Sequence, residues 1–280
     1  MPNHLHTTSG KFGMTSKIVL ITGASSGIGL ATAERLLESG FIVYGTSRDI
    51  TNAAQYKFHL IELDVNNNES VTHAVEKVLE NEGRIDVLIN NAGFAIAPAG
   101  AEESSMQQAQ AIFDTNFFGA VRMIRAVIPI MRQQKSGLIL NISSILGLLP
   151  MPFGALYSAS KHALEGYSES LDHELRTQGI RVSLIEPAYT KTSLGINLLE
   201  ADAKILAYDH IREKQHQQMI KSINKSDSPD VVAQTILKVI NSPQILSRYT
   251  AGKTAKRLKN LRRFAPVNLF DTLIQRSLKV

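Results

Sequence analysis

The sequence predicts an α/β fold built on a parallel sheet of about seven strands, doubly wound with helices on both faces. Short apolar runs rich in β-branched residues alternate with longer stretches of helical periodicity. The runs are apolar almost throughout, as in parallel strands that helices cover on both sides. A glycine-rich turn separates the first run from the first helix, which is typical of α/β folds that bind nucleotides.

The elements follow one another in strand-helix order along the chain. The predicted strands are 17–22, 41–46, 58–64, 86–90, 138–142, 181–186 and 248–250. The predicted helices are 28–39, 70–81, 106–134, 157–178 and 209–221, with a further helix that starts at Pro229 after a Ser228 cap. Pro129 lies near the end of 106–134, where we expect it to kink the helix or end its last turn.

The chain is expected to form one main domain, residues 14–252, because its 280 residues suit a single large α/β domain. Residues 1–13 are polar and lack the apolar centre of a signal peptide, so we expect a disordered leader or an added extension. The pattern loosens over 188–228, a predicted substrate loop that is either a mobile lid or an ordinary surface excursion. Residues 253–280 form a basic amphipathic extension.

Composition excludes several kinds of site. The chain has no cysteine, so disulfides, thiolate catalysis and cysteine metal ligands are ruled out. A cytoplasmic location is expected, with which the absence of cysteine is compatible, although that absence is neutral about compartment. The histidines show no metal-ligand spacing, since His162 and His173 lie far apart on one predicted helix, and no metal site is predicted. No apolar run approaches the ~18 residues that a membrane-spanning helix needs.

Positive charge is concentrated in the last part of the chain. Residues 248–280 carry nine Lys and Arg and one acid, Asp271, for a net +8, whereas residues 1–247 balance at −3. This uneven distribution disfavours nucleic acid as a partner of the whole fold. The extension is expected to pack on the domain or on a partner subunit, and peripheral contact with an anionic membrane is the less favoured alternative.

The turn after the first strand is the candidate cofactor site. Its sequence, 22–29, is Thr-Gly-Ala-Ser-Ser-Gly-Ile-Gly. Glycines at these positions let the backbone turn tightly and approach a pyrophosphate at the helix N-terminus. A plain strand-to-helix connection is the alternative, but the strand before the turn and the amphipathic helix after it argue against that. The predicted contacts are Gly23, Ser25, Ser26, Gly27, Ile28 and Gly29.

The ends of the next strands indicate which cofactor fits. An acid after the second strand would bind the ribose hydroxyls, whereas an arginine accommodates a 2′-phosphate. The chain has Arg48 there, with Asp49 one place too late, so NADP(H) is the preferred cofactor and NAD(H) a possible one; an exposed loop arginine without this role is the alternative. Asp64 is placed to orient the adenine. The other predicted contacts at strand ends are Val65, Asn91, Ala92 and Gly93.

Tyr157 and Lys161 are the candidate chemical groups. Four residues apart on a predicted helix, their side chains rise from the same face. A nearby ammonium favours the phenolate and lowers a tyrosine pKa from its usual value near ~10. Ser144 could bind the same substrate oxygen. Taken alone, the spacing fits equally well a solvated lysine beside a half-buried tyrosine.

Together these motifs resemble the short-chain dehydrogenase/reductase family, in the branch with a Tyr-x-x-x-Lys active site. The resemblance covers residues 17 to about 252. The motifs that carry it, in chain order, are Thr22–Gly29, Asp64, Asn90–Gly93, Asn116, Ser143-Ser144, Tyr157 with Lys161, and Pro187 with Thr192.

The resemblance implies a role for each catalytic residue. Tyr157 is the general acid/base at the substrate oxygen, and Lys161 lowers its pKa and holds the nicotinamide ribose. Ser144 polarises and positions that oxygen. Asn116 holds a water that links Lys161 to solvent, and Thr192 contacts the nicotinamide amide or the phosphate. Homodimers or homotetramers are expected through helices 106–134 and 157–178.

One departure and one apolar segment refine this expectation. The family usually has Pro-Gly where this chain has Pro187-Ala188, and the alanine methyl restricts the backbone near the nicotinamide. Residues 147–154 are strongly apolar and suggest a hydrophobic pocket, which resembles the 17β-hydroxysteroid and retinol dehydrogenase subgroup. The predicted pocket residues are Phe94, Ile96, Ser144, Leu146, Leu149, Tyr157 and Tyr189.

The sequence therefore predicts an NADP(H)-dependent oxidoreductase that interconverts a secondary alcohol and a ketone, or an alcohol and an aldehyde, on a lipophilic small molecule. Two alternatives stay open. One is a catalytically silent nucleotide-binding regulator on the same fold, since a fold does not fix a function. The other is a membrane-surface binding protein whose extension provides the contact.

Overall fold

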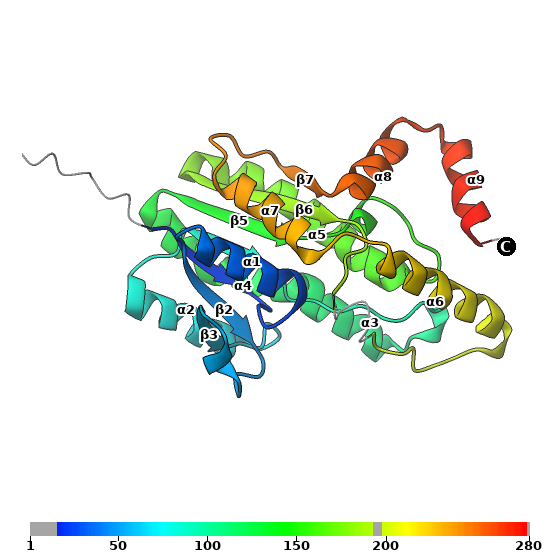
Figure 1. Cartoon of the computed structure of the whole chain (residues 1–280), viewed down its shortest axis with the longest axis horizontal. Helices are drawn as coiled ribbons and strands as arrows, with labels where there is room; N and C mark the ends of the chain where they lie inside the picture. Colours follow the sequence, from blue (N-terminus) through cyan, green and yellow to red (C-terminus); the bar gives the residue numbers. More distant parts are fainter. Residues whose placement is uncertain (1–15, 193–197, 279–280) are drawn as a thin grey trace, which may run out of the picture.

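The computed structural model describes residues 16–192 and 198–278, so the predicted leader over 1–13 lies outside the described residues. Its centre is a seven-stranded sheet in the order β3-β2-β1-β4-β5-β6-β7 with every neighbouring pair parallel, which confirms the predicted fold class (Figure 1). The strands are β1 (Ile18–Ile21), β2 (Ile42–Ser47), β3 (His59–Glu62), β4 (Val87–Asn90), β5 (Gly137–Ile142), β6 (Ile180–Pro187) and β7 (Arg248–Ala251).

Helices cover both faces of this sheet. The helices are α1 (Gly27–Glu38), α2 (Asn68–Glu82), α3 (Met106–Phe113), α4 (Gly119–Gln134), α5 (Ala155–Leu175), α6 (Asp209–Asn224), α7 (Pro229–Ile240), α8 (Lys253–Phe264) and α9 (Val267–Leu278). Buried side chains of α2, α4 and α5 join one core cluster with one face of the strands. Those of α1 and α7 join a second cluster on the opposite face. The continuously apolar strands supply both clusters, as a sheet buried on two sides requires.

The predicted helix 106–134 is interrupted near its middle. Asp114–Phe118 forms a wider π-helical turn between α3 and α4. Inside it, the Asn116 side chain accepts from the Phe94 amide and donates to the Phe94 carbonyl, at 2.9 Å each. Such widened turns occur where a side chain is recruited out of the regular helix. Further on, α4 continues through Pro129 to Gln134, so the proline does not end the helix.

The segment over 188–228 is attached to the domain where the structure describes it. It carries α6, and the buried Glu103 side chain accepts from the Ile205 amide at 2.8 Å and pairs with Arg212. Ser105 donates from its amide to Asp202 at 2.7 Å. These contacts hold residues 202–212 against the loop before α3. The mobile-lid interpretation stays a prediction.

The C-terminal extension forms two helices, α8 and α9. Ala265 between them is extended, with φ −72° and ψ 135°, because the following Pro266 disfavours helical backbone at that position. Figure 1 shows α8 and α9 at one end of the molecule, beyond β7. In the described part of the chain, no helix combines the length and the apolar character needed to cross a bilayer.

Candidate active site

The candidate site lies at the carboxyl ends of the central strands. β1 is flanked by β2 on one side and by β4 on the other, so the strand order reverses there. In open α/β sheets ligands bind in the crevice outside such a switch point. The turns after β1, β2, β4, β5 and β6 all meet at this edge, and they contain most of the predicted site residues.

The glycine turn after β1 has the backbone geometry that its sequence predicts. Gly23 and Gly27 have φ values of +66° and +57°, a region that residues with a Cβ rarely adopt. A Cβ on Gly29 would lie 2.2 Å from the Gly23 carbonyl oxygen, so only glycine fits where α1 begins. A Cβ on Gly27 would lie 3.2 Å from the Thr192 side chain. The turn therefore brings Thr192 beside the N-terminus of α1, where a phosphate would bind.

The ends of β1 and β4 are held together by side-chain hydrogen bonds. The Thr22 hydroxyl accepts from the amides of Asn91 and Ala92, at 2.9 Å each. In return, the Asn91 side chain donates to the carbonyls of Thr22 and Gly23, also at 2.9 Å. These bonds fix the floor of the crevice, along which the small residues 91–93 run. A Cβ on Gly93 would lie 2.9 Å from Asn116, so the cradle extends to the catalytic side.

Arg48 and Asp49 differ in whether their side chains are free to bind a ligand. Arg48 is exposed and makes no hydrogen bond or ion pair with any described residue. The Asp49 carboxylate accepts from the Thr51 hydroxyl at 2.5 Å and from its amide at 2.8 Å, and these bonds lower the Asp49 pKa. The acid is therefore engaged in its own turn, whereas the guanidinium is free to meet an anion. Asp64 likewise accepts from the Asn66 amide, at 3.0 Å.

Ser144 and Tyr157 lie together at the end of β5. Ser144 follows the strand and caps the 3₁₀ turn Ile145–Gly147, where its hydroxyl accepts from the Leu146 amide at 3.1 Å. Its hydroxyl also lies beside the Tyr157 phenol, where burial raises the pKa and the hydrogen bond with Ser144 offsets part of that rise. The neighbouring Ser143 is buried beside Glu165 instead. Of the two adjacent serines, Ser144 is the one that faces the tyrosine.

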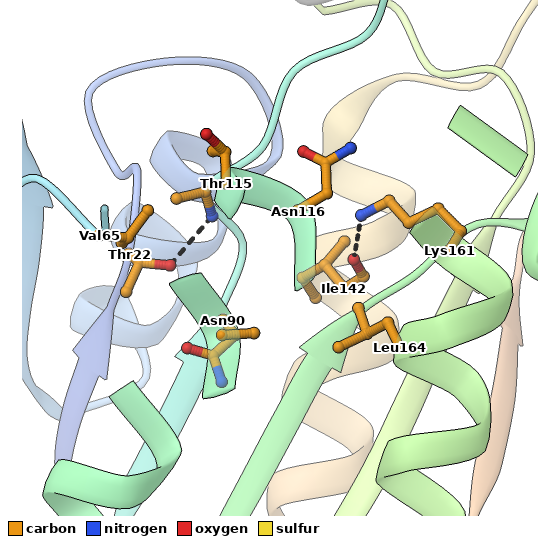
Figure 2. Close-up of a pocket in the computed structure, with 10 residues that line it drawn as sticks. Thr22, Val65, Asn90, Thr115, Asn116, Ile142, Lys161 and Leu164 are labelled. Carbon is orange, nitrogen blue, oxygen red and sulfur yellow. Dashed lines mark hydrogen bonds between the residues drawn. The ribbon is translucent and has the colours of Figure 1, made fainter. Parts of the chain in front are cut away.

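Lys161 and Asn116 complete the group. The Lys161 Nζ donates to the Ile142 carbonyl at 2.9 Å and lies 5.8 Å from the centre of the Tyr157 ring. Figure 2 shows Lys161 reaching from its helix toward Ile142, with Asn116 projecting into the same space. Both residues line a small cavity, together with Thr22, Asn90 and Leu164, that has room for about one water molecule. Asn116 also donates to the Ser160 hydroxyl at 3.2 Å.

Burial sets the proton affinities of the pair. It raises the pKa of Tyr157 to about 12 and lowers the pKa of Lys161 to about 8. Burial outweighs the lowering that the sequence predicts from Lys161, whose ammonium donates to a backbone carbonyl and lies 5.8 Å from the ring centre; that lowering stays a prediction. At neutral pH the phenol therefore carries its proton. Such a group is suited to donate a proton to a substrate oxygen.

Sequence reasoning missed a cluster of buried charges behind the pair. Glu165, one helical turn beyond Lys161, pairs with Arg248 of β7. Arg248 also pairs with Glu169, and with the fully buried Glu186 of β6 at 3.2 Å. Burial raises the pKa of Glu165 to about 7, while Ser143 and Arg248 lower it. The sequence does show Glu165 on the same helix face as Tyr157 and Lys161. It does not show its partner, because Arg248 is 83 residues away from Glu165 in the chain.

The C-terminal helices pack on residues that the sequence assigns to the substrate pocket. Phe270 of α9 is buried against Ile145 and Leu149, and Leu146 and Ala188 pack on the same cluster. Leu149 is thus covered by the extension, and its place in an open pocket stays a prediction. Ile96 bridges to Leu199, and Tyr189 is half-exposed with its hydroxyl 3.6 Å from the Met151 sulfur.

The family follows from a comparison with known sequences. The model of the short chain dehydrogenase family matches residues 17–203, a stretch that includes the glycine turn, Ser144, Tyr157 and Lys161. The chain belongs to the short-chain dehydrogenase family. It is accordingly an oxidoreductase of the dehydrogenase/reductase type, as its sequence predicts.

Relatives of this short-chain dehydrogenase include enzymes of lipid and steroid chemistry. A 3-ketodihydrosphingosine reductase of Bacteroides thetaiotaomicron is 47% identical over 188 residues, which cover 66% of this chain and 68% of the relative. Estradiol 17-beta-dehydrogenase 1 of Rattus norvegicus is 36% identical over 260 residues, covering 84% and 74%. The crystal structure of a short-chain dehydrogenase from Streptomyces avermitilis superposes with a TM-score of 0.80 at 30% identity, covering 94% and 99%.

Solved structures of similar proteins contain different nicotinamide cofactors. ElxO, at 26% identity and a TM-score of 0.72, has NADP bound, and a Burkholderia phymatum dehydrogenase, at 26% and 0.75, is in complex with NAD. The residues of this short-chain dehydrogenase fit such a group, because a helix N-terminus and a cradle without Cβ atoms face the crevice. These observations support a nicotinamide cofactor, of either the NAD or the NADP form.

Proposed function

We propose that this short-chain dehydrogenase reduces the ketone of a lipophilic small molecule to a secondary alcohol, with NADPH as its preferred cofactor. The main support is a juxtaposition at the end of β5. A protonated phenol and a serine hydroxyl lie together there, beside a wall that is apolar and built partly from the C-terminal helices. The reverse reaction uses the same groups.

Each side chain would contribute one step. The nicotinamide, when bound, supplies or accepts the hydride. Ser144 donates a hydrogen bond to the substrate carbonyl oxygen and orients it. Tyr157 gives that oxygen its proton as the carbon is reduced. Lys161, held by the Ile142 carbonyl, keeps a positive charge near the phenol and stabilises the phenolate left behind. Asn116 lies where the small cavity connects to Lys161 and supports return of the proton.

The apolar wall supports a lipophilic substrate. Ile145, Leu149 and Phe270 are each at most 6% exposed, and Leu146, Leu148 and Ala188 pack around them. The partly exposed Leu146, Leu148 and Ala188 can still contact a substrate, and burying its methylene groups against them is favourable by about 0.8 kcal/mol for each CH₂. That the Bacteroides relative is a 3-ketodihydrosphingosine reductase supports a ketone on a long aliphatic chain.

The preference for NADPH rests on the loop after β2. Arg48 is exposed and unpaired among the described residues, whereas the only acid beside it is engaged by Thr51. A free guanidinium attracts a 2′-phosphate, whereas the neighbouring Asp49 is engaged by Thr51 and is not free to bind the ribose hydroxyls.

A panel of ketones tests this function. We expect NADPH absorbance to fall with long-chain and steroid ketones and to change little with short polar ones, and the alcohols to be oxidised in reverse. A nucleotide-binding regulator would bind NADPH and turn over none of them. A higher kcat/KM for small polar ketones than for lipophilic ones would contradict the proposed substrate class.

A further inference from the structure

The helices α8 and α9 present an outer surface that nothing in the described structure covers. Phe264 and Val267 are 75% and 76% exposed, and Leu269 and Leu273 are also exposed. The same two helices also carry exposed basic side chains. We call this set the tail surface; its basic members are Lys253, Lys256, Arg257, Arg262, Arg263 and Arg276.

We propose that the tail surface docks this protein on an anionic lipid bilayer. Amphipathic helices with basic residues beside aromatic and aliphatic ones lie in the interface of such membranes. The apolar side chains enter the boundary between headgroups and acyl chains, and the cations meet lipid phosphates and carboxylates. Exposed hydrophobic residues elsewhere, such as Leu206 and Met106, lack this concentration of cations on the same helix.

The charge distribution favours an anionic partner. Residues 253–278 carry seven Lys and Arg and one acid, Asp271, whereas residues 1–247 have a net charge of −3. An anionic surface therefore attracts one end of the molecule and repels the rest, which orients the protein. Arg263 lies 5.6 Å from the Phe264 ring, so a cation and a lipophilic side chain approach the membrane together.

A second copy of this chain fits the tail surface less well. A twofold interface places the same patch of both subunits face to face. Here that arrangement would bring six basic side chains of each copy against those of the other, with only Asp271 to offset them. A bilayer that contains acidic lipids neutralises the same charges.

The inner side of the same helices explains what docking would achieve. Leu258, Leu261 and Phe270 pack on Ile145 and Leu149, beside Ser144. A bilayer against α8 and α9 therefore lies next to the predicted pocket, and a lipophilic ketone could pass between them without crossing water. This last step rests on the proposed function, whereas the docking itself does not.

Vesicle flotation without substrate tests the docking. The full chain is mixed with vesicles of phosphatidylcholine alone or of phosphatidylcholine with phosphatidylserine. We expect flotation only with phosphatidylserine, and loss of it as salt is raised. Lys256→Gln with Arg263→Gln removes two cations spaced two turns apart on α8, and should weaken binding roughly 30-fold. Phe264→Ser with Leu269→Ser removes the apolar contact and should weaken it as well.

Matched controls test whether vesicle binding depends on the tail surface itself and not on exposed cations or apolar side chains elsewhere. Lys57→Gln with Lys77→Gln changes exposed cations near β3 and α2, which Figure 1 shows at the other end of the molecule from α9. Leu206→Ser changes an 85% exposed side chain outside the tail surface. Both should float as the unaltered chain does.

Several outcomes would overturn the docking. Equal flotation with neutral vesicles, no flotation at all, or tail variants that float normally would each do so. Light scattering could instead show oligomers that the Phe264→Ser, Leu269→Ser variant does not form. If the unaltered chain then also fails to bind vesicles, the tail surface is a contact with a second copy of the chain. Far-ultraviolet circular dichroism and thermal unfolding without vesicles should match in all variants and show that they are folded. If the chain floats but reduces no ketone, docking stands and the proposed function fails.

Discussion

The nucleotide-binding half of the molecule and its catalytic half use different physical means. In β1, β2 and β4 with α1, the buried polar side chains are neutral, namely Thr22, Thr32, Thr46 and Asn90. The binding surface there is shaped by backbone, through Gly23 and Gly27. The catalytic half around β5, β6 and β7 instead buries Lys161, Glu165 and Glu186. A cofactor needs a close-fitting backbone, whereas proton transfer needs charges in a medium that does not screen them.

The largest expected effect is on the chemistry of the catalytic half. Tyr157→Phe removes the proton donor and should lower kcat/KM for a ketone roughly 10⁴-fold. Fluorescence titration with NADPH should give an unchanged Kd, because the glycine turn is untouched. A variant that retained full activity would contradict the assignment of Tyr157, and a large loss of NADPH affinity would show that the two halves do not act separately.

The second effect is on stability. Arg248→Met leaves the buried Glu165 and Glu186 without their guanidinium, and should lower the free energy of unfolding by about 4 kcal/mol. Arg248→Lys should restore part of it. The matched control is Arg35→Met, which breaks the half-exposed pair with Asp230 and should cost less than about 1 kcal/mol. Urea unfolding measures both. Equal losses of unfolding free energy in the two variants would contradict the proposed difference between the catalytic half and the nucleotide-binding half.

A third test concerns pH. Burial raises the pKa of Glu165 to about 7, so the folded protein binds this proton more tightly than the unfolded chain. The contribution of Glu165 is therefore fully present below the unfolded pKa of about 4.5 and is lost as pH rises through about 7. Glu165→Gln should abolish this dependence, which is on the order of 3 kcal/mol.

The control for this test is Glu169→Gln. Glu169 contacts the same Arg248, but its pKa is lowered, first by the hydrogen bond from Arg248. Its contribution is present above the unfolded pKa and is lost on acidification, so the slope of stability between pH 5 and 7 should persist in this variant. Thermal unfolding over that range compares the two. An unchanged slope in Glu165→Gln would place the titration on another group.

The smallest expected effect is on cofactor choice in the nucleotide-binding half. Arg48→Ala should raise the KM for NADPH roughly 10-fold and leave that for NADH nearly unchanged. Lys57→Ala removes a nearby exposed cation and should change neither value. Initial rates with each cofactor measure the difference. Equal changes for both cofactors in Arg48→Ala would reject the preference for NADPH.

How much could be predicted from the sequence depended on how local the signal was. The strands, the glycine turn and the fold class could be predicted, because each rests on residues that are neighbours in the chain. The π-helical turn at Asn116 could not, since its cause is a contact with Phe94, 22 residues earlier. The pairing of Glu165 with Arg248 likewise depends on β6 and β7 lying side by side. The break between α8 and α9 does have a local signal, because Pro266 disfavours helical backbone at Ala265.

The position of Arg248 late in the chain also has a consequence for biosynthesis. Ser144, Tyr157 and Lys161 leave the ribosome well before it, together with the acids that it neutralises. Domains generally begin to fold from the N-terminal side during translation. Until β7 emerges, Glu165 and Glu186 have no guanidinium to balance them, and their burial is unfavourable. The nucleotide-binding half has no such requirement, so the order of translation would complete the cofactor site first and the reactive site last.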